Sequence, residues 1–151
     1  MFFFLYLSSY SARLNASFEL GEFASAIPLA EMGEQLSGPC TESGWSQLGN
    51  HLKMQFAEPS ILSEEECKGN PEAGEMGYAT FCAGEEGTGT AVMCPGYTGS
   101  PLACTRPDNS TVLAGLQSFT YVCFEAGAPS VYAEIAGLRD WVDYIMDKFQ
   151  D

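Results

Sequence analysis

The chain has 151 residues, a formal net charge of −14 and a sequence pI of about 4.1. Only six Lys and Arg stand against twenty Asp and Glu, which excludes the basic stripe that nucleic acids need. A hydrophobic content of 46% with 16 Gly and 8 Pro excludes a disordered chain and favours one domain of short strands and turns over a helix bundle. The acidity indicates a solvated surface rather than a specific electrostatic role.

The apolar start of the chain, residues 1–7, has two interpretations. Met1-Phe2-Phe3-Phe4-Leu5-Tyr6-Leu7 is similar to the apolar core of a signal peptide, but no basic residue precedes it and no clear cleavage site follows. The run is too short to span a bilayer, so we expect no membrane contact. We favour a buried strand at residues 2–7 and keep the signal peptide as the alternative.

Loops and two strands fill the first third of the chain. Residues 10–18 are expected to form a loop, 23–29 an extended connector because Pro28 disfavours helix before it, and 31–39 a turn. A strand is predicted at residues 41–47, followed by a turn at Gly49-Asn50. Another strand is predicted at 51–57, where Leu52, Met54 and Phe56 alternate with polar residues as on a half-buried face.

The middle of the chain contains one short helix among strands. Ser63-Glu64-Glu65-Glu66 is a capping box, which predicts a helix that carries Cys67. Further strands are expected at residues 78–83 and 130–135, with an acidic, glycine-rich loop at 84–89. Residues 101–105 and 111–119 are predicted to form a hairpin across the turn at Asn109.

An amphipathic helix is predicted at residues 137–149. Its apolar positions have the 3.6-residue period: Leu138, Trp141, Val142, Ile145, Met146 and Phe149. We expect the aromatic side chains of Trp141, Tyr144 and Phe149 in the core and those of Asp140, Asp143 and Asp147 in solvent. The predicted fold class is all-β, an antiparallel Greek-key barrel with a short intermediate helix and a C-terminal helix.

Six cysteines and two glycosylation sequons, at Asn15 and Asn109, indicate a secreted, extracellular protein with three disulfides. Six cysteines allow fifteen pairings, so their number alone does not give the connectivity. His51 is the only histidine and there is no Cys-x-x-Cys, so we expect no metal and no cofactor. The acidic runs 64–66 and 85–86 lack the ligand spacing of a calcium loop.

The segment from Cys94 to Cys104 reads Cys-Pro-Gly-Tyr-Thr-Gly-Ser-Pro-Leu-Ala-Cys. Its Gly-x-x-Gly turn exposes Thr98 and directs backbone N–H groups outward. Such a turn presents a nucleophile beside an oxyanion hole.

In order along the chain, several segments resemble the second half of the chymotrypsin/trypsin family of serine proteases. The segment 94–102 resembles that family's Cys-x-Gly-Asp-Ser-Gly-Gly-Pro-Leu. The other matching segments are Ile27-Pro28-Leu29, Cys40 with Gly44-Trp45, Ser63 to Cys67, Phe81-Cys82-Ala83-Gly84, Pro129-Ser130-Val131-Tyr132 and Trp141-Val142.

The resemblance implies a single partial peptidase domain over residues 1–151. Residues 1–39 would form a strand and the connector between two barrels, 40–136 the C-terminal barrel, and 137–149 the terminal helix. It also implies the disulfide pairs Cys40–Cys104, Cys67–Cys82 and Cys94–Cys123.

The catalytic residues of the family are replaced. The resemblance puts Thr98 at the position of the nucleophilic serine, Tyr97 at that of the preceding acid and Ser100 at that of the second glycine after it. Gly96 and Thr98 match the oxyanion-hole donors, although we favour a purely structural loop. The family's histidine lies in a first barrel that this sequence lacks, its triad acid would fall near Met1, and His51 matches a surface loop. We therefore assign no catalytic residue.

The specificity pocket of the family is also altered. Its base matches Val92, which offers no charge to a basic side chain, and its walls match Thr120 and Ser130 where open pockets have glycine. Ser118 matches the family's serine, and Phe119 stands in place of the usual tryptophan. Side chains at these positions should narrow or fill the slot.

The sequence favours a non-catalytic, secreted homologue of trypsin-like proteases that serves as a binding or regulatory module. One alternative is a fragment of a longer, two-barrel protein that resembles a serine endopeptidase. A second alternative is a homodimeric secreted structural protein. The partner would be an unidentified protein, for example an N-terminal barrel or a second copy of the chain.

Overall fold

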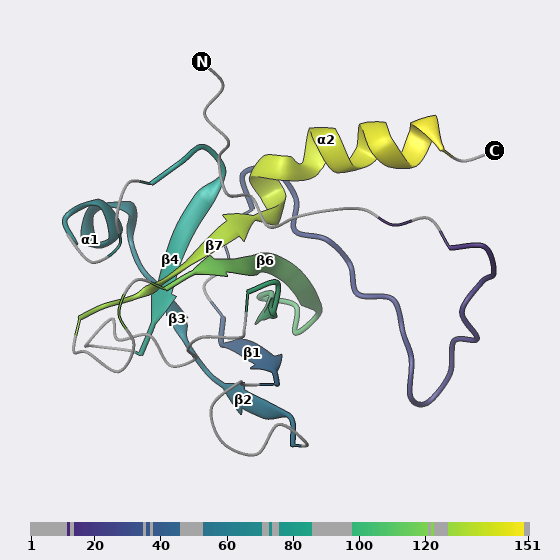
Figure 1. Cartoon of the computed structure of the whole chain (residues 1–151), viewed down its shortest axis with the longest axis horizontal. Coiled ribbons are helices and arrows are strands. Elements are labelled where there is room, and N and C mark those ends of the chain that lie inside the picture. Colours follow the sequence, from purple (N-terminus) through teal and green to yellow (C-terminus); the bar gives the residue numbers. More distant parts are fainter. Residues whose placement is uncertain are drawn as a thin grey trace.

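The computed structural model describes residues 12, 14–34, 36, 38–45, 53–70, 73, 76–85, 98–120, 122 and 127–149. Seven antiparallel strands and two helices lie within these ranges (Figure 1). The strands are β1 (Cys40–Gly44), β2 (Gln55–Ala57), β3 (Ser60–Ile61), β4 (Thr80–Gly84), β5 (Pro101–Thr105), β6 (Thr111–Phe119) and β7 (Ser130–Glu134). The helices are α1 (Glu64–Lys68) and α2 (Ile135–Lys148).

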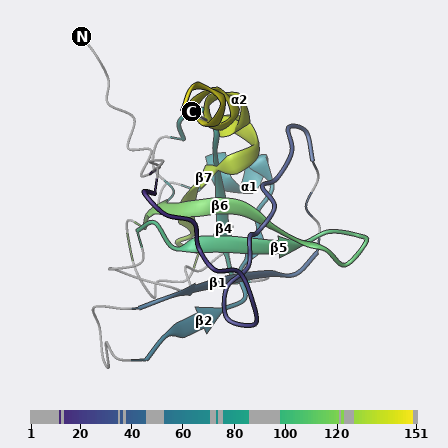
Figure 2. The same cartoon turned by 90° about the vertical axis from the view of Figure 1, so that its right-hand side faces the viewer.

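The sheet curls back on itself as a barrel wall. The strand order is β2-β1-β5-β6-β7-β4-β3, so the two outer strands are consecutive in the sequence and only Glu58 and Pro59 separate them. Figure 2 shows β6, β5, β1 and β2 as successive layers below α2. The predicted all-β fold class, an antiparallel barrel with a short intermediate helix and a C-terminal helix, is confirmed, as is the hairpin of residues 101–105 and 111–119.

Strand β6 carries two bulges that control what faces the interior. Its pairing with β5 skips Ala114, and its pairing with β7 skips Ser118. A bulge puts two consecutive residues opposite one residue of the partner strand, so inward and outward positions no longer alternate strictly. Both Gln117 and Ser118 are consequently buried.

Helix α1 begins as the sequence predicts. The Ser63 hydroxyl accepts a hydrogen bond from the Glu66 backbone N–H, and the Glu66 carboxylate accepts one from the backbone N–H of Ser63 at 2.9 Å. This reciprocal cap satisfies two N–H groups that the helix leaves without partners. Cys67 is the buried residue of the helix and forms a disulfide with Cys82 of β4.

Helix α2 starts two residues earlier than predicted, at Ile135, directly after β7. The prediction that Trp141, Tyr144 and Phe149 lie in the core is wrong, because all three side chains are exposed. Only Ile135 and Ala136 are buried, and Figure 1 shows the later turns of α2 extending past the barrel. The 3.6-residue period identifies an apolar face but not the surface that covers it.

A long exposed segment precedes the barrel. Residues 14–28 lie on the surface and form the loop that leaves the barrel in Figure 1. The segment returns at Leu29, which forms a parallel bridge with Leu113, and the Leu113 N–H donates to the Pro28 carbonyl at 2.8 Å. Ala30 then packs against Val112 and Ala136, so this connector covers one side of β6.

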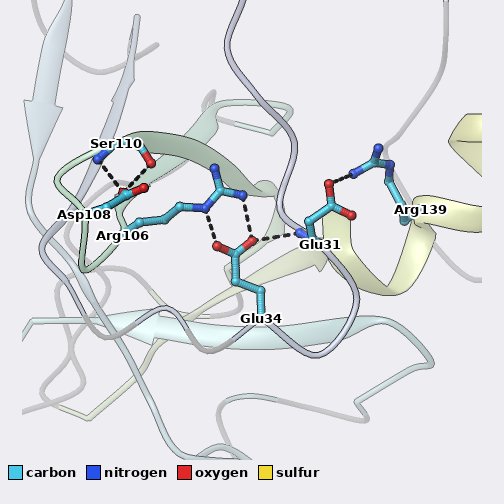
Figure 3. Close-up of polar contacts among 6 residues, drawn as sticks. All are labelled: Glu31, Glu34, Arg106, Asp108, Ser110 and Arg139. Atoms are coloured by element: carbon cyan, nitrogen blue, oxygen red, sulfur yellow. Dashed lines mark hydrogen bonds and ion pairs between the residues drawn. The ribbon is translucent and has the colours of Figure 1, made fainter.

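Two ion pairs hold the connector to the barrel and to α2 (Figure 3). The Glu34 carboxylate binds two of the three guanidinium nitrogens of Arg106, Nε and Nη2. The Glu31 Oε1 lies 2.8 Å from the Arg139 Nη1. The Glu31 backbone N–H also donates to the Glu34 carboxylate at 2.9 Å. The Arg106 hydrogen bonds, followed by that N–H, lower the pKa of Glu34 to about 2.

Other expectations for the first half of the chain have mixed outcomes. The strand expected at residues 51–57 is shorter, and Met54 and Phe56 are exposed rather than half-buried, because β2 is an outer strand of the sheet. The expected strand at residues 2–7 and the turn at Gly49-Asn50 lie outside the described residues. Within the described ranges, no helix is long and apolar enough to cross a membrane.

Candidate functional site

The turn that holds Thr98 is attached to the bulged end of β6. The Gly99 N–H donates to the Gln117 carbonyl at 2.7 Å, and the Gln117 N–H donates to the Ser100 carbonyl at 2.9 Å. Gly99 has φ +88°, a left-handed conformation that a residue with a side chain rarely adopts. The exposed Thr98 hydroxyl, in turn, donates to the Ser118 carbonyl with an Oγ1–O distance of 3.4 Å.

The positions matched to the walls of the specificity pocket contact each other. The hydroxyl oxygens of Thr120 and Ser130 are 2.7 Å apart and share a hydrogen bond. The Gln117 side-chain amide donates to both, at 3.1 Å to Thr120 and 3.2 Å to Ser130. Three polar side chains therefore bridge the ends of β6 and β7 at the place where the resemblance puts a slot for a substrate side chain.

A buried carboxyl lies one step further into the barrel. Glu42 of β1 is fully buried between its strand partners Ala57 and Leu102, and the Tyr132 hydroxyl donates to its Oε2 at 2.9 Å. Its Oε1 has no hydrogen-bond partner among the described residues. The Ser130 side chain lies close enough to Tyr132 to lower its pKa, so a polar chain runs from Glu42 through Tyr132 to the bridged hydroxyls.

Burial determines the protonation states of Glu42 and Tyr132. Desolvation raises the pKa of Glu42 to about 7, and the hydrogen bond from Tyr132 opposes that change only in part. Burial, reinforced by the Glu42 charge, raises the pKa of Tyr132 well above its ordinary value of 10. A group that titrates near neutral pH inside a barrel makes this region sensitive to pH.

The structure describes only part of the predicted site. The disulfides Cys40–Cys104 and Cys67–Cys82 are formed as the resemblance implies. Phe119 packs against the cluster of Cys67, Cys82 and Val131. Six predicted residues lie outside the described ranges: Val92, Cys94, Gly96, Tyr97, Cys123 and His51. In the part of the chain that the structure describes, no three His, Cys, Asp or Glu side chains gather in a group that could hold a metal ion.

Sequence reasoning missed Glu42, Gln117 and Tyr132 as parts of this site. A signal for Glu42 existed, because strand residues two apart share a face and Cys40 must face the interior to form its disulfide. No comparable signal existed for Gln117, since its inward direction depends on the bulge at Ala114, which shifts the buried positions of β6 by one residue.

Comparison with known proteins gives consistent results. The family model described as Trypsin matches residues 10–142. Trypsin-1 of Astacus astacus is 31% identical over 86% of this chain and 56% of its own length, and trypsin-1 of Salmo salar is 34% identical over 73% and 44%. The human atrial natriuretic peptide-converting enzyme is 34% identical over 68% of this chain and 10% of its own length. The chain thus spans about half the length of the trypsins it matches, and far less of the converting enzyme.

Proposed function

The chain belongs to the trypsin family, and on that premise we propose that it is a non-catalytic member that serves as a secreted binding or regulatory module. The single observation that carries the proposal is the environment of Thr98. Threonine occupies the position matched to the nucleophilic serine, and its hydroxyl donates to the Ser118 backbone carbonyl.

A hydroxyl becomes a useful nucleophile only when a base accepts its proton during attack, which contributes about 10²–10⁴-fold to the rate. A backbone carbonyl has no such basicity. Among the described residues, no histidine or carboxylate is hydrogen-bonded to Thr98. The Thr98 hydroxyl therefore donates its proton to a carbonyl that is too weakly basic to remove it during attack.

The hydrogen-bonded set at the pocket positions supports the same proposal. A substrate side chain entering between Thr120 and Ser130 would have to break their mutual hydrogen bond and those from Gln117. Leaving a buried polar group without a partner costs about 1–3 kcal/mol. The closed arrangement thus opposes substrate binding independently of the nucleophile.

A secreted location is supported by the two disulfides, since such bonds persist in oxidising compartments. The exposed turn at Asn109, in a sequon, is a suitable glycosylation site. We include both in the proposal.

The test is labelling with a fluorophosphonate probe, read as the intact mass of the native protein. We expect no adduct on the wild type, while a trypsin treated in parallel is fully labelled. The variant Thr98→Ser separates the two parts of the argument, and we expect it to stay unlabelled because no base among the described residues is hydrogen-bonded to that position. An adduct on Thr98 of the wild type would refute the proposal. An adduct on the serine of the variant would show that a base does activate a hydroxyl at this position.

A second candidate function is association through apolar side chains. Phe18, Leu20 and Phe23 of the connector loop and Tyr144 and Phe149 of α2 are at least half exposed. Exposed apolar surface on this scale is typical of interaction sites. We propose a second copy of the chain as the partner, which predicts a mass near twice 16.3 kDa in light scattering at high concentration. A strict monomer would contradict it.

A further inference from the structure

A cavity of about 510 Å³ lies between α1, the segment before β4, β4 itself and the end of β7. Its volume falls within the range of small-ligand sites. Polar and charged groups make up much of the lining, and one part of the wall is apolar and rich in sulfur: Leu62, Met76, Phe81 and the Cys67–Cys82 disulfide. The Sδ of Met76 lies 3.5 Å from the Cys67 Sγ and 3.7 Å from the Cys82 Sγ.

One carboxylate of the cavity is uncompensated. Glu134, the last residue of β7, is half-buried, and none of the described residues forms a hydrogen bond or ion pair with its side chain. Desolvation raises the pKa of this carboxyl. The one cation among the lining residues, Lys68, is already paired with Glu64, which also lines the cavity. The described residues therefore supply no counterion to a charge on the Glu134 carboxylate.

The backbone beside the cavity is strained. Ala79 has φ +52°, which is unfavourable for a residue with a Cβ, and its carbonyl accepts from the Glu134 N–H at 2.8 Å. A Cβ added at Gly137 would lie 2.6 Å from the Ala79 Cβ and 3.1 Å from the Glu134 Oε2, so only glycine allows this packing. Strain of this kind concentrates at ligand sites. The neighbouring Tyr78 lines the cavity and is 74% exposed.

We propose that this cavity binds an alkylguanidinium or alkylammonium group, with the cationic head against Glu134 and the apolar stem along Leu62, Met76 and Phe81. Tyr78 at the mouth supplies an aromatic face, which attracts cations electrostatically. The ligand is either a free organic cation or an arginine or lysine side chain of a protein.

This site shares no residue with the Thr98 turn or the polar chain of Glu42. The inference therefore goes beyond the proposed function and holds whether or not Thr98 is inert.

The experiment titrates the full chain with n-butylguanidinium and, as a neutral isostere, n-butylurea, followed by amide NMR shifts and calorimetry. A hydrogen bond to a charged group predicts about tenfold tighter binding of the cation. The largest shifts are expected at Gly77–Phe81 and Glu134. Equal affinity for the two probes, or shifts centred on other elements, would overturn the proposal.

Two variants with the same change in net charge make the result specific. Glu134→Gln should lose the tenfold preference, whereas Glu65→Gln, on the exposed side of α1 outside the cavity, should keep it. A retained preference in E134Q contradicts the site. Should E134Q fail to fold, the wild-type comparison of the two probes decides alone. The peptide acetyl-Gly-Arg-Gly-amide separates the sources: binding as tight as that of n-butylguanidinium indicates a protein side chain, and binding of n-butylguanidinium alone indicates a free cation.

Discussion

Glu42 predicts that the stability of this protein falls as the pH rises through the neutral range. Its folded-state pKa of about 7 exceeds the ordinary value of 4.5, so the folded protein retains a proton that the unfolded chain releases. The neutral carboxyl is the form that the barrel interior favours. The destabilisation is therefore absent below about pH 4.5, grows between pH 4.5 and 7, and is complete above pH 7.

The magnitude follows from the two pKa values. The interval from 4.5 to about 7 corresponds to about 3 kcal/mol of unfolding free energy, at about 1.4 kcal/mol for each pKa unit. Replacing Glu42 with Gln or Met removes this titration, and Met also avoids an amide without a hydrogen-bond partner. Relative to either variant, the wild type should lose about 3 kcal/mol between pH 4.5 and pH 8.

The assay is urea unfolding at a series of pH values, monitored by tryptophan fluorescence. Subtracting the unfolding free energy of the variant from that of the wild type at each pH cancels the contributions of the other acidic residues. Tyr132→Phe keeps the ring that stacks on Phe81 but removes the hydrogen bond that lowers the Glu42 pKa, so its loss of stability should extend to higher pH. Parallel curves for the wild type and the Glu42 variants from pH 4 to 8 would refute the reasoning.

Three further predictions concern the surface and the covalent links. The pKa of Glu34 is lowered to about 2, chiefly by Arg106, so the stability that wild type gains over Glu34→Gln should be present above pH 4.5 and vanish as the pH falls through 2 in acid-unfolding curves. Replacing Cys40 and Cys104 with serine opens a link between residues 64 apart and should cost about 4 kcal/mol in urea unfolding; an unchanged midpoint would contradict it. Asn109→Gln should remove an endoglycosidase-sensitive mass increment from the protein secreted by eukaryotic cells, and an identical mass for both would exclude that glycan.

The features that sequence predicts well are those with local signals. The capping box at Ser63 specifies the start of α1 through groups three residues apart, and the turn at Asn109 specifies the hairpin. The features it misses depend on distant partners. Trp141 belongs to a correctly predicted helix, yet its burial depends on how far α2 extends past the barrel. Gln117 faces the interior because the bulge at Ala114 shifts the buried positions of β6 by one residue.

The polar chain from Glu42 to Thr120 explains why the pocket region should stay closed whatever residue occupies position 98. Buried polar groups are stable only with partners, and here Tyr132, Ser130 and Gln117 each satisfy a neighbour. Removing one hydroxyl leaves a neighbouring polar group without its hydrogen bond, which costs about 1–3 kcal/mol of stability. Single substitutions in this hydrogen-bonded set are therefore unfavourable. If the proposed function is right, a serine at Thr98 would supply a hydroxyl nucleophile but would not open a slot between Thr120 and Ser130. The replaced nucleophile and the bridged pocket positions would then be separate obstacles to catalysis, and the second would depend on the packing of the barrel.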